Sequence, residues 1–366
     1  MPFINDMLAE RNHRCATDPA NAQTLPLPNR TSRFHFEPSA VMGLLRERIV
    51  GQPQALDTVE ATLKIIKADI GDPERPLHVG LLLGPTGVGK TELVRVLAEA
   101  IHGQRDAVCR IDMNTLAQEH YAAALTGAPP GYVGSKEGTT LLDADRIAGS
   151  FGAPGIVLFD EIEKASAEVS RALLNVFDNG QLTLTSGTKT IDFRNTMIFM
   201  TSNLGAREIE RYLSSLQRGW RRLLPVSKAR QRRGLHQIVD HALHDQFDPE
   251  FVNRIDTVSL FNWIEHDMLD VLIDIELQKL NSRLARIGHQ AELDASARAL
   301  LCKRGFDRRY GAREMRRAFR RHVELPLAET LADANLQKRE SAQVRTLYGR
   351  AYKKDRMRFY SAENPD

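Results

Sequence analysis

The sequence is poor in the features that mark secreted and membrane proteins. Its three cysteines, Cys15, Cys109 and Cys302, are odd in number and far apart, so neither a disulfide framework nor a zinc site is indicated. The N-terminus lacks a basic region followed by an apolar stretch, and no apolar run reaches bilayer length. We therefore expect a cytoplasmic protein with no membrane partner.

The sequence also has little excess of charge of one sign. The formal net charge is +3 over 366 residues, which is too small by itself to indicate a nucleic-acid partner. Basic residues do cluster locally, in a segment at residues 218–233 that contains no acidic side chain. This basic segment is either a solvated insertion or a surface for an acidic partner or nucleic acid.

Short apolar stretches and helical patterns alternate through the middle of the chain. The apolar stretches occupy residues 79–83, 107–112, 155–159 and 195–201. Buried strands that alternate with helices of about ten to fifteen residues predict a parallel sheet with helices on both faces. The fold class is therefore expected to be α/β.

The chain is expected to divide into four parts. Residues 1–37 have little periodicity and read as a poorly ordered arm, and residues 38–261 hold the α/β domain. After residue 256 the pattern is almost wholly helical, so residues 262–343 are expected to form a small, mainly helical domain. Residues 344–366 are expected to form either a terminal strand or an exposed tail.

A glycine-rich turn lies between the first buried strand and an amphipathic helix. Glycines let consecutive backbone N–H groups surround a polyphosphate, and the helix N-terminus attracts negative charge. The spacing G-x-x-x-x-G-K-T predicts a phosphate-binding loop in which Lys90 reaches the β- and γ-phosphates and the hydroxyl of Thr91 holds Mg²⁺. The loop consists of Gly84, Pro85, Thr86, Gly87, Val88, Gly89, Lys90 and Thr91.

Polar residues follow two other predicted strands. Asp160 and Glu161 end the stretch at 155–159, where Asp160 would lie near Mg²⁺ and Glu161 could polarise the attacking water. Asn203 follows the stretch at 195–201, where its amide could touch the γ-phosphate or that water. Read alone, these residues are also common in turns, but the upstream phosphate loop favours the chemical interpretation.

Two arginines are ambiguous on spacing alone. Arg254 lies far from the loop in sequence and could be a surface arginine paired with Asp256. Arg313 opens the last long helical pattern and could be one member of a basic face. The residues themselves leave both alternatives open.

Taken together, the motifs resemble an AAA+ ATPase of the Clp/heat-shock unfoldase family, most closely the second ATPase domain of ClpB and ClpA. The resemblance runs from about residue 44 to 336 with the motifs in order. It identifies residues 84–91 as a Walker A motif and residues 157–165, which include Asp160, as Walker B. It also implies that Val50 packs on the adenine, that ATP and Mg²⁺ are bound, and that the fold is a P-loop sheet followed by a helical lid.

The resemblance also assigns roles to the more distant residues. It places Asn203 at sensor 1, Arg254 at an arginine finger that acts on a neighbouring subunit, and Arg313 at sensor 2 of the lid. A finger that acts in trans implies a ring, and the family implies a homohexamer. Tyr132 and Val133 resemble the pore loop that grips a translocating polypeptide, because an aromatic ring on a glycine-rich loop can contact any chain.

The sequence departs from the family in two respects. The residues before position 38 are too few for the substrate domain and first ATPase ring of Clp unfoldases. No Ile-Gly-Phe loop lies between Asn203 and Arg254, where the basic segment stands instead, so a ClpP-type peptidase partner is not expected.

Three functions fit these observations. The first is an ATP-hydrolysing ring that unfolds or remodels protein clients by threading them past Tyr132. The second is a nucleic-acid-associated switch that uses the basic segment and a face made of Arg316, Arg317, Arg320 and Arg321. The third is an assembly or regulatory ring that does not thread its clients. The tyrosine at the pore position favours the first.

Overall fold

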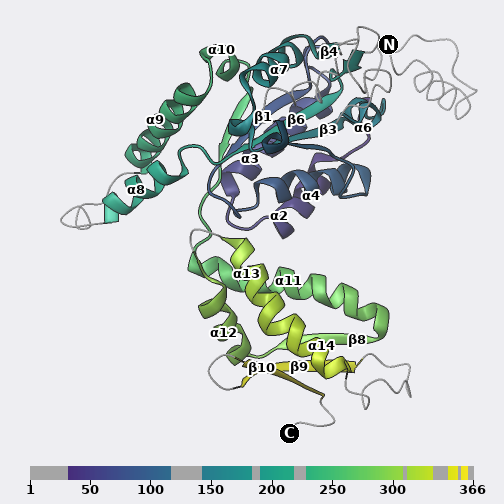
Figure 1. Cartoon of the computed structure of the whole chain (residues 1–366). Helices are drawn as coiled ribbons and strands as arrows, with labels where there is room; N and C mark the ends of the chain where they lie inside the picture. Colours follow the sequence, from purple (N-terminus) through teal and green to yellow (C-terminus); the bar gives the residue numbers. More distant parts are fainter. Residues whose placement is uncertain are drawn as a thin grey trace, which may run out of the picture. The chain divides into compact units, whose positions relative to one another are not determined.

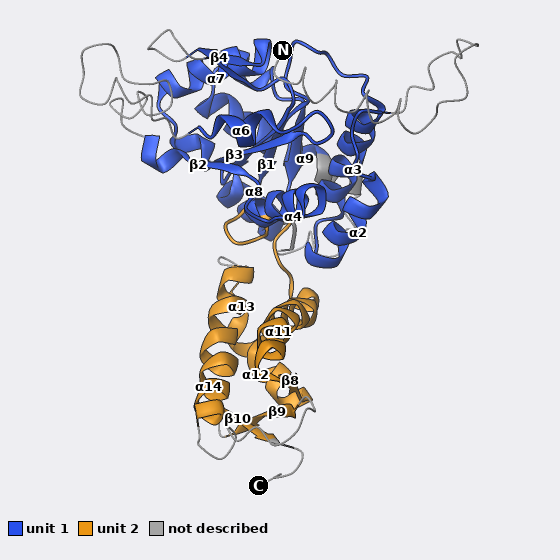
Figure 2. Cartoon of the chain, turned by 90° about the vertical axis from the view of Figure 1, so that its right-hand side faces the viewer, with its two compact units in different colours: residues 1–84, 90–261 blue, residues 85–89, 262–366 orange. Residues whose placement is uncertain are grey.

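A computed structural model gives the structure of the chain (Figure 1). It describes residues 32–116, 142–183, 190–217, 228–307, 311–332, 345–352 and 356–361. The chain divides into two compact units, one of residues 1–84 with 90–261 and one of residues 85–89 with 262–366 (Figure 2). Among the described residues, no helix has both the length and the apolar character needed to cross a bilayer.

A five-stranded parallel sheet forms the centre of the first unit, in the order β2-β3-β6-β1-β7. Every residue of β1, β3 and β6 is buried, as expected of strands that are covered on both faces. This confirms the predicted fold class. The strands are β1 (His78–Leu83), β2 (Cys109–Asp112), β3 (Gly155–Asp160), β6 (Thr196–Ser202) and β7 (Thr257–Leu260).

Helices surround this sheet (Figure 1). In α7 the Ser166 hydroxyl accepts a hydrogen bond from the Val169 N–H at 3.4 Å and so caps the start of the helix, and Gly180 ends the helix with φ 59°. The helices are α2 (Pro38–Arg48), α3 (Pro53–Ala68), α4 (Lys90–His102), α6 (Ala144–Ala148), α7 (Ala167–Asn179), α8 (Ala206–Gln217), α9 (Lys228–Gln246) and α10 (Pro249–Val252). A small hairpin of β4 (Gln181–Thr183) and β5 (Thr190–Asp192) follows α7.

The end of the expected N-terminal arm belongs to the folded domain. Phe34 and Phe36 are 1% and 8% exposed, and the Lys67 ammonium donates hydrogen bonds to both of their carbonyl oxygens at 2.8 and 2.9 Å. Burial of two aromatic rings stabilises this segment by several kcal/mol, on the order of 2 kcal/mol each. The arm expected over residues 1–37 is therefore too long at its C-terminal end, while residues 1–31 lie outside the described part.

The second unit is mainly helical but also contains a small sheet, in the order β10-β9-β8. The expectation of an almost wholly helical pattern after residue 256 is corrected by β7 in the first unit and by β8 here. The final segment forms two antiparallel strands rather than one. The elements are α11 (Leu269–Leu284), β8 (His289–Leu293), α12 (Ala295–Gly305), α13 (Ala312–Phe319), a π-helical turn, η6 (Arg320–Glu324), α14 (Leu325–Ala332), β9 (Arg345–Tyr352) and β10 (Arg356–Ser361).

Candidate active site

Three neighbouring strands end at the same edge of the parallel sheet. In the sheet order, β6 lies between β3 and β1, and Leu83 of β1 is in register with Ser202 of β6. The glycine-rich loop follows β1, Asp160 and Glu161 end or follow β3, and Asn203 follows β6. Because parallel strands present their carboxyl ends on one side, the chain brings these polar groups together there.

The loop backbone has the geometry of an anion cradle. Gly84, Gly87 and Gly89 have φ values of 146°, 79° and 106°, a region that favours glycine. A Cβ at Gly84 would also lie 2.8 Å from the carbonyl oxygen of Phe261. Within the described chain, the N–H groups of Gly87, Val88 and Gly89 donate to no backbone carbonyl. These free donors at the start of α4 fit a phosphate group.

Lys90 is the cation of this site. It is buried, with 8% of its surface exposed, and its ammonium donates a hydrogen bond to Asn203 Oδ1 at 2.8 Å and another to the Gly84 carbonyl. The Asn203 N–H in turn donates to Glu163 Oε1 at 3.2 Å. The first residue of α4 is thus linked directly to the residue after β6.

The carboxylate of Asp160 is held on both oxygens. Its Oδ1 accepts hydrogen bonds from the hydroxyls of Thr201 and Thr91, the latter at 3.4 Å. Its Oδ2 accepts two from the Arg110 guanidinium, at 3.1 and 2.6 Å. Thr91 and Asp160 therefore place two hard oxygen ligands side by side, and such ligands suit Mg²⁺.

The described residues offer few protein ligands for a metal ion at this site. Across the described part of the chain, no three His, Cys, Asp or Glu side chains gather in a metal-binding arrangement. This fits an ion that is bound by one carboxylate, one hydroxyl and the oxygens of a phosphate ligand, because Mg²⁺ commonly takes few protein ligands.

Glu161 adopts a strained backbone conformation beside this carboxylate. Its φ of 57° lies in the left-handed region, and its N–H donates to the Thr201 hydroxyl at 3.1 Å. Its side chain accepts a hydrogen bond from Asn114 Nδ2 at 2.6 Å, and the same amide group donates to Asp112 at 2.9 Å. The Glu161 carboxylate is thus held by Asn114, and it makes no described contact with Thr91 or Asp160.

Three residues of this network were not among the sequence candidates: Arg110, Asn114 and Thr201. Arg110 and Asn114 lie on and just after β2, which pairs with β3 so that Asp112 stands opposite Asp160. Their polar side chains flank the end of a strand, which is a usable signal once β2 is known to neighbour β3.

The remaining candidates that the structure describes lie on other elements of the chain. Arg254 follows α10, where its guanidinium binds Asp178 at 2.6 Å and Glu250 at 3.2 Å. Val50 is half-buried in the turn between α2 and α3, and Arg313 is exposed on α13 of the second unit. Tyr132 and Val133 lie outside the described residues.

Within the second unit, the loop residues 85–89 contact the start of α13. The Ala312 N–H donates to the Gly87 carbonyl oxygen at 2.9 Å. Gly311 has φ 53°, and a Cβ there would lie 2.9 Å from the same oxygen. The glycine-rich loop is therefore linked to the helix that carries Arg313.

Comparison with known families agrees with this geometry. A model described as the AAA domain (Cdc48 subfamily) matches residues 75–258, and a model of the C-terminal D2-small domain of ClpB protein matches residues 264–344. The chain is 54% identical over 347 residues to an ATP-dependent protease ATP-binding subunit-like protein, AmiB, from Pseudomonas aeruginosa. That match covers 91% of this chain and 93% of the relative.

Two further relatives show how far the similarity extends. A protein of Rhodococcus erythropolis described as an ATP-dependent protease ATP-binding subunit-like protein is 46% identical, again over 91% of this chain and 93% of the relative. The chaperone protein ClpB of Vibrio cholerae is 39% identical over 79% of this chain but only 31% of its own length. The chain thus spans the two shorter relatives and about a third of ClpB.

Proposed function

Because this chain belongs to the AAA domain family, in the Cdc48 subfamily, and carries a ClpB-type D2-small domain, we propose that it is an ATP-hydrolysing ring that remodels proteins. The observation that carries the proposal is the direct bond between Lys90 and Asn203 beside the paired Thr91 and Asp160. These contacts support the proposal because they bring together, at the ends of three strands, the residues that we assign to phosphate binding, γ-phosphate sensing and metal binding.

The proposed hydrolysis uses each group at a stated atom. The loop N–H groups and the Lys90 ammonium bind the phosphate oxygens, and Thr91 and Asp160 would hold Mg²⁺, whose charge would neutralise that of the phosphates. The Glu161 carboxylate accepts a proton from the attacking water, and the Asn203 amide orients that water or the γ-phosphate. Val50, in the turn after α2, would pack on the adenine.

The site is completed by a neighbouring subunit in this proposal. Arg254 carries a full positive charge and is the expected trans-acting finger, which would stabilise charge on the transferred phosphoryl group. Arg313 would act from the lid as sensor 2. An active ring of this kind is a homohexamer, as is typical of the family.

Mixing two inactive variants tests the trans assignment. We expect Arg254→Ala and Glu161→Gln each to lose at least about 100-fold in ATP turnover, because loss of an arginine finger costs on the order of 10³ or more. Mixed rings should regain measurable turnover, since a subunit with intact Glu161 then sits beside one with intact Arg254. Light scattering in ATP checks that both variants assemble.

One outcome of this mixing experiment would contradict the trans assignment. If both variants form hexamers and mixed rings stay inactive, Arg254 does not act in trans. Asp178→Asn is the matched control, because it removes the ion pair of Arg254 within its own subunit and leaves the guanidinium in place. That variant should keep turnover within about threefold, as expected of a partly exposed pair.

The remodelling step is tested at the pore residue. Tyr132→Ala should keep ATP turnover but lose the unfolding of a tagged, folded fluorescent substrate, since the aromatic ring is the expected grip on the client. Tyr132→Phe is the control and should keep both activities. Unfolding that survives in Tyr132→Ala would support the third function, a ring that does not thread its clients.

The structure gives less support to the nucleic-acid alternative. Of the four arginines expected to form a basic face, Arg316 pairs with Glu276 at 3.4 Å and Arg317 pairs with Glu314 at 3.5 Å. These acids reduce the positive potential that phosphate binding requires. Binding of DNA that weakens with salt and stimulates hydrolysis would restore this alternative.

A peptidase partner is not part of the proposal. The two shorter relatives carry a protease subunit in their names, but this chain has its basic segment where a docking loop would stand. Residues 218–227 of that segment lie outside the described part, and α9 begins at Lys228.

A further inference from the structure

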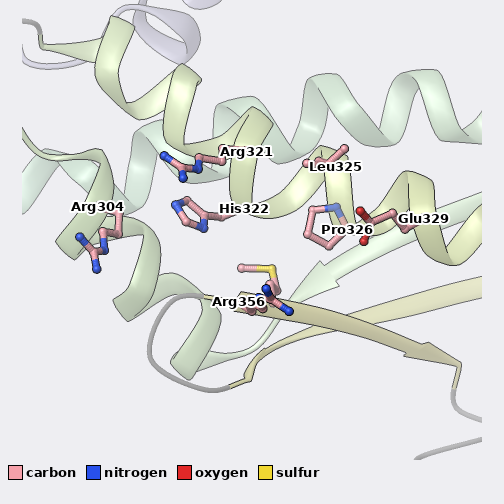
Figure 3. Close-up of a pocket in the computed structure, with 8 residues that line it drawn as sticks. Arg304, Arg321, His322, Leu325, Pro326, Glu329 and Arg356 are labelled. Carbon is pink, nitrogen blue, oxygen red and sulfur yellow. The ribbon is translucent and has the colours of Figure 1, made fainter.

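The second unit contains a cavity of about 550 Å³ that the proposed ATPase cycle does not use. Three elements surround it: the end of α12, the π-helical turn with the start of α14, and the first residues of β10 (Figure 3). A volume of this size is typical of sites for small organic ligands. We call it the C-terminal basic pocket; its lining residues are Arg304, Arg321, His322, Leu325, Pro326, Glu329, Arg356 and Met357.

The lining carries more positive than negative charge. Among the described lining residues, the basic side chains are three arginines and a histidine, and the one acid is Glu329. Among the described residues, no acidic group lies within ion-pair distance of Arg321 or Arg356. Other arginines of this unit are neutralised, as in the pairs Arg283–Glu324 and Arg298–Asp274. A concave surface with unneutralised guanidinium groups attracts anions.

The opposite side of the pocket combines apolar side chains with the carboxylate of Glu329. Leu325 is 57% exposed, although it is a large hydrophobic residue, and Met357, which also lines the pocket, is 3% exposed. Figure 3 shows Leu325, Pro326 and Glu329 on one side and Arg304, Arg321 and His322 on the other. A ligand that fills this pocket therefore has an anionic end and an apolar body.

A local distortion of the helix shapes the basic side. Residues Arg320–Glu324 form a π-helical turn, and Pro326 follows two residues later. In a regular α-helix the ring of Pro326 would clash with the carbonyl of His322, four residues earlier, and the wider turn relieves this clash. Such turns are frequent at functional sites, and this one carries both Arg321 and His322.

We propose that the C-terminal basic pocket binds a phosphorylated small molecule, with the phosphoryl group on the arginines and the organic body on Leu325, Pro326 and Met357. Guanidinium groups match phosphate oxygens in a bidentate fork, and Arg321 and Arg356 present two such groups from two different elements. An acidic peptide would use the same charge but needs no apolar wall, so the lining favours the phosphorylated ligand.

Calorimetry with two probes tests this site. The protein is the full chain with Lys90→Ala, so that the phosphate loop contributes no binding. Phenyl phosphate should bind, and inorganic phosphate should bind more weakly because it leaves the apolar wall empty. Arg321→Gln with Arg356→Gln should weaken phenyl phosphate at least about tenfold, which corresponds to the loss of one charge-assisted hydrogen bond.

Arg320→Gln is the matched control for this experiment. Arg320 is exposed on the same π-helical turn but does not line the pocket, so its loss should change the affinity less than about twofold. If the double variant melts early, Arg356→Lys replaces it, because it keeps the charge without the fork and should still weaken binding.

Three results would overturn the proposal. These are no binding of phenyl phosphate, equal weakening in the Arg320→Gln control, or binding of an acetylated tetraglutamate peptide in place of phenyl phosphate. ATP turnover of the wild-type chain is measured separately, so failure of the pocket and failure of the ATPase are distinguishable.

Discussion

Lys90→Ala should abolish nucleotide binding at the glycine-rich loop. The Lys90 ammonium is buried and already points to the loop, where it bonds to Asn203 at 2.8 Å and to the Gly84 carbonyl. A bound polyphosphate would take over these donors, and a hydrogen bond to a charged group stabilises by about 1.5–3 kcal/mol. Loss of two such bonds weakens binding by at least about 100-fold.

Isothermal titration calorimetry with ATP and Mg²⁺ measures this effect directly. Lys64→Ala is the control, because Lys64 is exposed on α3 and pairs with Glu60 at 2.6 Å, so ATP affinity should stay unchanged. A second readout is thermal: ATP should raise the melting temperature of the control and leave that of Lys90→Ala unchanged. Normal ATP affinity in Lys90→Ala would remove the phosphate-loop assignment.

The sequence could predict that the residues expected to bind phosphate and metal lie close together, because each one comes at or after the end of a buried strand. Lys90, Asp160 and Asn203 come after three apolar runs, and parallel strands must present their ends on one side of the sheet. Sequence motifs also predicted the family, which the comparisons confirm. Both predictions depend on short sequence patterns, and they do not require knowledge of which strands pair.

The residues that the sequence did not yield depend on strand order. Arg110 reaches Asp160, and Asn114 reaches Glu161, only because β2 pairs with β3 at the edge of the sheet. The spacing of residues in the sequence does not show that β2 pairs with β3. The resemblance to the family identified only the motif residues, whereas Arg110 lies on β2 and Asn114 just after it, between the motifs.

The sequence analysis also did not predict the short strands β7 and β8. β7 has four residues and β8 has five, so neither shows enough alternation to distinguish it from a loop or a helix end. β9 and β10 stabilise each other as an antiparallel pair, and a single sequence does not show which partner a strand will take. Tertiary pairing, rather than local propensity, decides these elements.

Glu161→Gln should bind ATP normally and stall before hydrolysis. The glutamine amide oxygen can still accept the hydrogen bond from Asn114, and glutamine tolerates the φ of 57° as well as glutamate does. The change therefore removes little except a carboxylate that accepts a proton. General-base catalysis contributes about 10²–10⁴-fold, so turnover should fall by that factor while ATP affinity changes less than about threefold.

Single-turnover hydrolysis and calorimetry separate these two effects. Glu168→Gln is the control, because Glu168 is exposed in the first turn of α7 and no described contact links it to the site. Wild-type turnover in Glu161→Gln would show that another group accepts the proton, whereas loss of ATP binding would show that Glu161 is structural. If the variant stalls with ATP bound, its ring should retain a protein client, so a pull-down in ATP with this variant also identifies what the ring remodels.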